Sequence, residues 1–264
     1  MKHKSILAAA IVALAFCLTA CNGTVSPTEP MTQTHSASTA TLPTETEVPH
    51  SALYTEVPHS ALYVENLDIK NVIQYFNEVC LDAEFVNSGN ASLLQKWEEP
   101  ICYRLNGDPT DKDLEVINNF TAWLNTIDGF PGISEAQETQ TPNLQIHFCT
   151  RTELLSLMGD NFANTDGAVT FWYRNNAIYD EIICYRNDID QFIRNSVILE
   201  EIYNGLGPVQ DTSLRADSII YSGYSEPQQL TGIDELILRL LYHPDMKCGM
   251  NAQECEAVIR QLYY

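Results

Sequence analysis

Residues 198–207 read ILEEIYNGLG, and this stretch decides how the fold is interpreted. In a helix, residues four apart share a face, so Glu200 and Asn204 project side by side while Glu201 points about 100° away. One of the two glycines at the end stops the helix, because glycine tolerates positive φ. The stretch is therefore predicted to be a helix that presents polar side chains and ends in glycine.

The N-terminal segment has the layout of an export signal. A positive start at Lys2 and Lys4 precedes an apolar core at residues 6–16, which is too short for a permanent membrane-spanning helix. Residues 18–21 (LTAC) resemble a bacterial lipobox. The resemblance implies removal of residues 1–20 and a lipid on Cys21, which would hold the protein on the outer face of a bacterial membrane. An ordinary signal peptide with the same cleavage is the alternative.

Residues 21–63 form a predicted tether between the lipid and the folded part. They are rich in Ser, Thr and Pro and have few large apolar side chains, so they cannot bury enough surface to offset the entropy of ordering. The sequence TEVPHSALY occurs at 46–54 and again at 55–63. Two short copies do not make a solenoid. Either a duplication in an unconstrained linker or a partner-binding motif accounts for them.

The remaining residues, 64–264, have the size of one domain, and their charge restricts the partners. The chain has 14 Lys and Arg against 35 Asp and Glu. Loss of Lys2 and Lys4 leaves a formal charge of 12 − 35 = −23. Such a surface repels phosphate backbones and anionic headgroups, so we expect no nucleic acid, and we expect membrane contact only through the lipid.

Six cysteines remain in the predicted domain after Cys17 and Cys21 are set aside, and an even number in an exported chain favours disulfides over metal ligation. Sequence alone does not choose among the fifteen connectivities that six cysteines allow. Cys248 with Cys255 is the favoured pair, because a capping box at 251–254 places Cys255 in a first helical turn after a loop that holds Cys248. The second favoured disulfide is Cys149 with Cys184, which lie on two candidate strands. Cys80 and Cys102 are the remaining disulfide candidates.

Hydrophobic periodicity predicts a mixed α/β (α+β) fold. A helix at 65–84 precedes a strand at 101–105, a helix from 110 or 111 to 126, and strands at 144–148, 168–173 and 178–185. Asn175-Asn176 is the expected turn between the last two strands. The helix of the opening motif then begins at Asp188 or Asp190. The connections are long enough for parallel pairing.

The opening motif resembles the zinc-binding helix of H-E-x-x-H proteases, in which two histidines hold the metal and the glutamate activates a bound water. Laid on that pattern, Glu200 replaces the first histidine and Asn204 replaces the second. Glu201 matches the catalytic glutamate and is therefore the catalytic candidate.

Downstream segments extend the resemblance to metzincins. Gly207 matches the glycine that turns the chain, and Gln210, followed by Asp211, takes the place of the third ligand. Residues 218–221 (SIIY) resemble the Met-turn, with isoleucine in place of methionine, and residues 234–242 resemble the closing helix.

The region at 97–123 resembles the opening strand and helix of matrixin-type domains. Residues 200–207, with LLYHP at 240–244 and GM at 249–250, are closer still to a family of uncharacterised bacterial lipoproteins that is related to zincins. The resemblance covers about the C-terminal two thirds of the chain. It implies one metzincin-like domain: a mixed sheet, a helix of the active-site type and C-terminal helices.

The same resemblance argues against zinc chemistry. Catalytic zinc sites use mainly histidine ligands, and the only histidines of the predicted domain, His147 and His243, fall outside the ligand positions. The oxygens of Glu200, Asn204 and Asp211 suit Ca²⁺ or Mg²⁺ better than zinc, so no zinc is expected.

Three interpretations of the two adjacent glutamates remain: solvated helix charge, a retained binding cleft, or acid–base catalysis. The leading expectation is a lipid-anchored envelope protein that binds a peptide, a protein or a wall component without cleaving it. The alternative is a hydrolase with a non-standard site centred on Glu201.

Overall fold

The computed structural model describes residues 9–11, 62, 67–81, 93–223 and 225–263. Signal-peptide residues other than 9–11, the lipidation residue Cys21 and nearly all of the tether, including the TEVPHSALY repeat up to residue 61, lie outside these residues. Helix bounds follow the sequence expectation closely where a cap is present. The 110–126 expectation corresponds to α2 (Asp111–Leu124), and Thr110 caps it in a capping box with Asp113.

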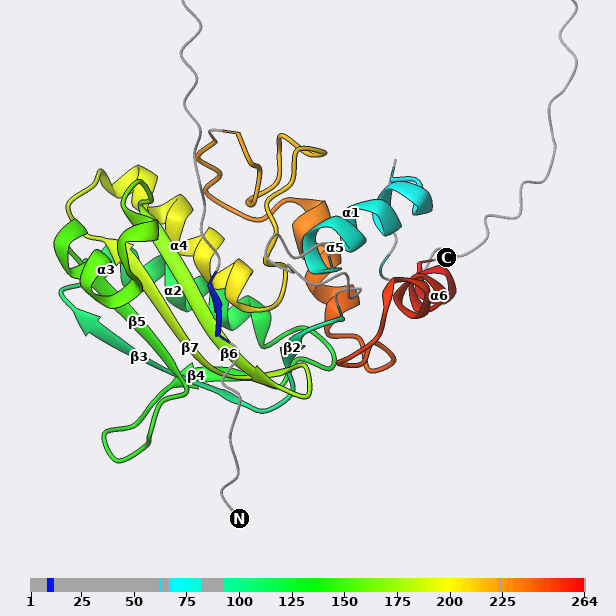
Figure 1. Ribbon diagram of the computed structural model, residues 1–264, viewed down its shortest axis with the longest axis horizontal. Coiled ribbons are helices and arrows are strands. Elements are labelled where there is room, and N and C mark those ends of the chain that lie inside the picture. Colours follow the sequence, from blue (N-terminus) through cyan, green and yellow to red (C-terminus); the bar gives the residue numbers. More distant parts are fainter. Residues whose placement is uncertain (1–8, 12–61, 63–66, 82–92, 224, 264) are drawn as a thin grey trace, which may run out of the picture. The chain divides into compact units, whose positions relative to one another are not determined.

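A seven-stranded sheet forms the centre of the described domain (Figure 1). Its order is β1-β6-β7-β5-β3-β4, and the short β2 pairs with β7 beside β5. The strands are β1 (Ala9–Ile11), β2 (Lys96–Trp97), β3 (Ile101–Gly107), β4 (Ile133–Glu135), β5 (Leu144–Cys149), β6 (Gly167–Arg174) and β7 (Ala177–Arg186). Strands β2, β3, β4, β5 and β7 run parallel, whereas β6 is antiparallel to both of its neighbours.

The β6–β7 hairpin is the local feature that the sequence predicts most sharply. Asn175 and Asn176 form its turn with φ of 52° and 65°. Asparagine tolerates this left-handed region better than other side-chain-bearing residues, and two such residues in succession produce the tight turn of a hairpin.

Helices cover the two sheet faces unequally. Helix α4 (Gln191–Gly205) packs on β6 and β7, and α2 packs on α4. Helix α3 (Arg151–Met158), with a short 3₁₀ turn at Asp160–Phe162, covers the opposite face through a small second core. The alternation of β7 explains this division, because Ile183 and Tyr185 join the large core while Ile182 and Cys184 join the small one.

Three more helices complete the domain: α1 (Ile69–Leu81), α5 (Gly232–Leu241) and α6 (Ala252–Leu262). Helix α1 packs against α6, so the two ends of the domain meet. Sequence reasoning missed β2, β4 and α3, although Thr150 and Glu153 form a capping box that marks the start of α3. No helix among the described residues is long and apolar enough to cross a membrane.

Candidate functional site

Helix α4 carries Glu201 inward, toward the sheet. The side chain is 3% exposed, and it lies against Gly167, the first residue of β6. A Cβ atom at Gly167 would come within 2.7 Å of Glu201 Oε1, so glycine provides the space for this carboxyl group. Solvated helix charge is therefore the wrong interpretation for Glu201.

A second buried glutamate, Glu181 of β7, lies beside the C-terminal end of α4. It is 1% exposed, and a Cβ at Gly205 would collide with its carboxylate. The Trp97 indole N–H closes the same region by donating a hydrogen bond to the Gly205 carbonyl at 3.1 Å. Two glycines thus accommodate two carboxyl groups between α4 and the sheet.

We call Glu181, Glu201 and Asn204 the buried polar cluster. Their side chains contain buried polar atoms that lack hydrogen-bond partners within the described part of the chain. Asn204 is fully buried. Among the described residues, Glu181 Oε1, Glu201 Oε2 and both amide atoms of Asn204 have no hydrogen-bond partner. An unsatisfied buried polar atom costs on the order of 1–3 kcal/mol, and such atoms concentrate where a protein has a use for them.

Burial decides the charge state of these carboxyl groups. Desolvation, followed by the neighbouring charges of Glu200, Asp211 and Glu181, raises the pKa of Glu201 well above its usual value. Desolvation also raises the pKa of Glu181 well above its usual value. Burial therefore favours the neutral, protonated form of both carboxyl groups, a form that can donate a hydrogen bond and is a poor general base.

Glu200 is half-buried and forms the more open part of the site. Desolvation, then the charges of Asp211 and Asp166, raises its pKa to about 8. Adjacent residues on a helix point in different directions, yet Glu200, Glu201 and Asp211 lie close enough to influence one another's protonation. We call Glu200, Asp211 and Asp166 the acidic rim.

The structure brings together most of the residues that the sequence selected. Glu200, Glu201, Asn204 and Asp211 all belong to this region. Gln210 is half-buried, and its backbone N–H donates to the Val79 carbonyl of α1 at 3.3 Å, so its observed contact ties the loop after α4 to α1.

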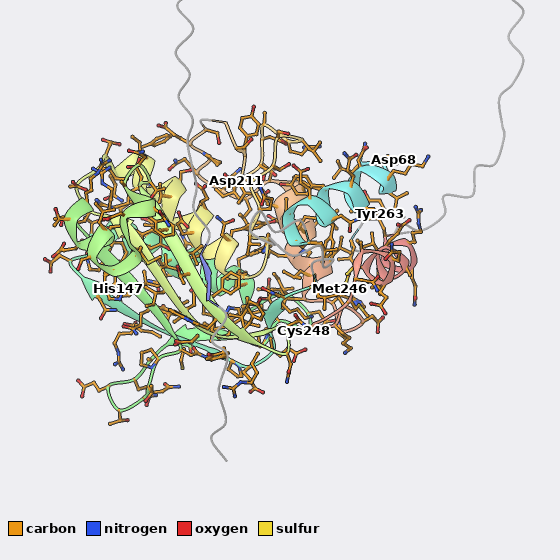
Figure 2. All side chains as sticks on the ribbon, viewed as in Figure 1. Asp68, His147, Asp211, Met246, Cys248 and Tyr263 are labelled. Carbon is orange, nitrogen blue, oxygen red and sulfur yellow. The ribbon has the colours of Figure 1, made fainter. Side chains whose placement is uncertain are left out.

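The histidines lie elsewhere. His147 is on β5, on the sheet face that α3 covers, and Figure 2 shows it well separated from Asp211. His243 lies in the turn after α5, where its ring accepts a hydrogen bond from the backbone N–H of Asp245.

The positions that would hold zinc in a metzincin carry Glu200, Asn204 and Gln210, which is followed by Asp211. Asn204 is fully buried, whereas Glu200 is half-buried. In the described part of the chain, no group of three His, Cys, Asp or Glu residues is placed to hold a metal ion.

The segment that resembles a Met-turn is a buried support between helices. Ser218 accepts a hydrogen bond from the Tyr75 hydroxyl of α1 at 2.6 Å and donates one to Asp234 of α5 at 2.7 Å. Asp234 also accepts from the backbone N–H of Ile219. Ile220 is fully buried.

The described cysteines are all free thiols, so neither expected disulfide is present. The favoured pair is apart because Cys248 lies against the Lys96 carbonyl, while Cys255 is buried in the core with Cys80 as a neighbour. The second pair is different: Cys149 and Cys184 share a hydrogen bond between their side chains.

Sequence reasoning missed Glu181, Gly167 and Asp166. The strand pattern in the sequence could have identified Glu181 as a core-facing residue, because it alternates with Ile183 and Tyr185 on the inward face of β7. A carboxylate at a core position indicates either a specific partner or a functional site. Nothing in the local pattern marked Gly167 or Asp166.

Comparison with known proteins identifies a family but no activity. The family model DUF2927, described as a protein of unknown function, matches residues 70–261. No curated protein matches the chain.

Proposed function

We propose, for a chain that belongs to the DUF2927 family of proteins of unknown function, that it is a lipid-anchored envelope protein whose domain binds an extended peptide segment without cleaving it. The observation that carries the proposal is the outer edge of β6. This strand is antiparallel to β7 and starts beside the buried polar cluster.

The edge of β6 has backbone groups available for another strand. In the described domain it pairs on its outer side only with β1, over Thr170, Phe171 and Trp172. That pairing supports the proposal, because it is an extended segment seated antiparallel on the edge. Residues 9–11 lie within the predicted signal peptide, so processing at Cys21 would free the edge for a separate peptide.

The acidic rim favours a basic peptide. Glu200 lies in the C-terminal half of α4, and Asp211 lies in the loop after this helix. Asp166 directly precedes β6. Desolvation, then the charges of Asp211 and Asp166, raises the pKa of Glu200, and a Lys or Arg of a bound peptide would relieve the repulsion between these carboxylates. The excess of acidic residues over the whole chain acts in the same direction.

Two features support a relationship with metzincins at the level of fold. The strand order β4-β3-β5-β7-β6, with β6 alone antiparallel within that set, stands beside a helix that carries the E-E-x-x-N motif. Gly207 turns the chain with φ of 129°, and a Cβ there would lie 2.6 Å from the Gln95 carbonyl oxygen. Glycine is therefore required at the position that resembles the metzincin glycine.

Burial supports binding rather than cleavage. A catalytic carboxylate must reach the reacting atoms, but Glu201 is nearly inaccessible, and burial raises its pKa well above the usual value and so favours its neutral form. The residues at the ligand positions also do not fit zinc. If the domain binds an oxygen-preferring cation such as Ca²⁺ or Mg²⁺, we expect Glu200 and Asp211 to supply the ligand oxygens.

The test uses the processed chain and short peptides of alternating valine and lysine, with matched peptides of valine and glutamate. The basic peptide should bind saturably and slow amide hydrogen exchange in residues 167–174, and the acidic peptide should not bind. Glu200→Gln should weaken binding, whereas Glu256→Gln on exposed α6 should leave it unchanged. Binding without protection of β6, or no binding, rejects the proposal.

The hydrolase alternative has one supporting observation. The pKa of Glu200 at about 8 is near the range in which general acids and bases operate. This alternative requires turnover of a peptide or ester substrate that disappears in Glu201→Gln, while circular dichroism shows an unchanged fold. Equal turnover in the mutant protein would exclude a site centred on Glu201.

A further inference from the structure

A hollow lies between α4 and α2, on the side of α4 that is turned away from Glu201. Its volume is about 490 Å³, within the usual range of small-ligand sites. Residues 228–230 of the loop before α5 form its third wall. The lining residues that matter for recognition are Asn119, Phe120, Trp123, Asn195, Leu199 and Gln228.

This hollow is separate from the buried polar cluster. Asn195 and Leu199 are four residues apart and share the face of α4 that is turned toward α2. Glu201 is two residues beyond Leu199, about 200° around the helix, and it faces β6. A ligand in the hollow would therefore not contact the cluster.

The charged residues of the lining are neutralised by ion pairs. Lys112 and Glu115 form a pair at 2.9 Å, and Glu235 lies 4.0 Å from Arg239. Arg239 itself stacks over the Trp123 ring, 5.5 Å from its centre. The hollow consequently offers no net charge to a ligand, and the acidic chain around it disfavours anions.

Aromatic and amide groups remain as the recognition elements. The rings of Phe120 and Trp123 are stacked, with centres 6.0 Å apart, and Trp123 is partly exposed. The Asn195 amide donates to Gln228 Oε1 at 3.2 Å and accepts from Gln191, while Gln228 donates to the Phe192 and Glu226 carbonyls. Among the described residues, these bonds fix both side chains and leave one Asn195 N–H and a second lone pair on each amide oxygen for a ligand. Asn119 is exposed, and no hydrogen bond of its side chain is found among the described residues.

We infer that this hollow binds a neutral oligosaccharide. A sugar ring has an apolar C–H face that packs on an indole, and the partly exposed Trp123 ring offers the part of its surface that Arg239 does not cover. The hydroxyl groups of a sugar both donate and accept hydrogen bonds. Side-chain amides match the hydroxyl groups because each amide carries one acceptor oxygen and two donor hydrogens. An uncharged ligand with one apolar face and a polar edge fits the arrangement of Trp123, Asn119 and the Asn195–Gln228 pair.

The test is calorimetric titration of the full chain with three neutral probes: an N-acetylglucosamine oligomer, a maltose oligomer and a blocked Gly-Ser peptide. At least one oligosaccharide should bind saturably. Trp123→Ala should weaken that binding by about tenfold or more, equivalent to roughly 1.4 kcal/mol. Asn119→Ala should weaken it several-fold, and because this residue is exposed, the substitution leaves the fold intact.

Two matched variants control for non-specific effects. Asn118→Ala alters the neighbouring exposed residue of α2, which does not line the hollow, and Tyr179→Ala removes an exposed aromatic ring of β7 that does not line it either. Both should bind like the parent. The inference would be overturned if no oligosaccharide bound saturably, or if only the blocked peptide bound. It would also be overturned if Trp123→Ala and Asn119→Ala bound the oligosaccharide as tightly as the parent does.

Discussion

The carboxyl group of Glu181 occupies the space that a side chain at position 205 would fill, so β7 and α4 approach each other only because residue 205 is glycine. We predict that Gly205→Ala lowers the free energy of unfolding by about 2 kcal/mol or more, since overpacking forces the backbone to shift. Urea denaturation measures the change.

The double variant Gly205→Ala with Glu181→Ala tests the same pair. Removal of the carboxyl group frees the space, so the two substitutions should be far from additive, and the double variant should be more stable than Gly205→Ala alone. Additive effects would show that Glu181 is not the cause of the clash.

Stability should decrease as pH rises. The pKa of Glu201 is raised well above the usual 4.5 and that of Glu200 is raised to about 8, so the folded state holds protons that the unfolded state has released. Their contribution is therefore fully present below about pH 4.5 and is lost as pH rises toward 8 and beyond.

Urea midpoints measured across this pH range check the prediction. Glu201→Gln keeps a neutral group in the same space and should flatten the decline, whereas Glu256→Gln on the surface of α6 should not. A stability that rises between pH 5 and 8 in the parent would contradict the shifted values.

The ion pair of Asp113 and Arg194 joins α2 to α4 at 2.8 Å, with side chains 0% and 6% exposed. Asp113→Ala leaves a buried guanidinium without its carboxylate and should cost about 3 kcal/mol or more. The exposed pair Arg215–Asp217 provides the control, because Asp217→Ala should cost less than about 1 kcal/mol. Equal costs would mean that burial does not decide the strength of these pairs.

Cys149 and Cys184 are free thiols, and we predict that oxidation joins them, because their side chains are within hydrogen-bonding contact. The register pairs His147 with Cys184 and Cys149 with Arg186, so the two cysteines are diagonal neighbours on one sheet face. Oxidised glutathione would accept the two electrons, and the thiols would release two protons. Mass spectrometry after alkylation should find this bond. Cys149→Ser should leave Cys184 alkylated, and protection of Cys184 in that variant would point to another partner.

The proposed lipidation of Cys21 predicts where the protein is found in a cell. The parent should partition with membranes and carry the mass of its acyl chains, because two or more chains anchor a protein stably. Cys21→Ser should release the protein from the membrane fraction. A membrane-bound, unacylated Cys21→Ser protein would show that an uncleaved segment is the anchor.

Periodicity and caps predicted most of the fold. The strands at 168–173 and 178–185 and the capped start of α2 needed only local signals, such as Asn175-Asn176 and Thr110. β2 and β4 were missed because strands of two or three residues carry no period of their own. Their pairing with β7 and β3 is decided by the tertiary structure.

The candidate site was predicted in part. The motif placed Glu200, Glu201 and Asn204 on one helix, and the structure confirms the α/β fold around it. The motif could not indicate that Glu201 faces Gly167 or that Glu181 lies nearby, because those contacts join residues that are distant in the chain. Burial, which separates a surface charge from a neutral acid, depends on these contacts.

The Tyr263 hydroxyl donates a hydrogen bond of 2.8 Å to the Leu67 carbonyl, across 196 residues of sequence (Figure 2). Ribosomes deliver a chain from its N-terminus, so the Leu67 carbonyl before α1 must wait until Tyr263 has been synthesised before this bond can form. Long-range closure of this kind slows folding. The packing of the N-terminal helix is therefore completed only after residue 263 has been delivered, which makes the junction of α1 with α6 one of the last parts of the domain to close.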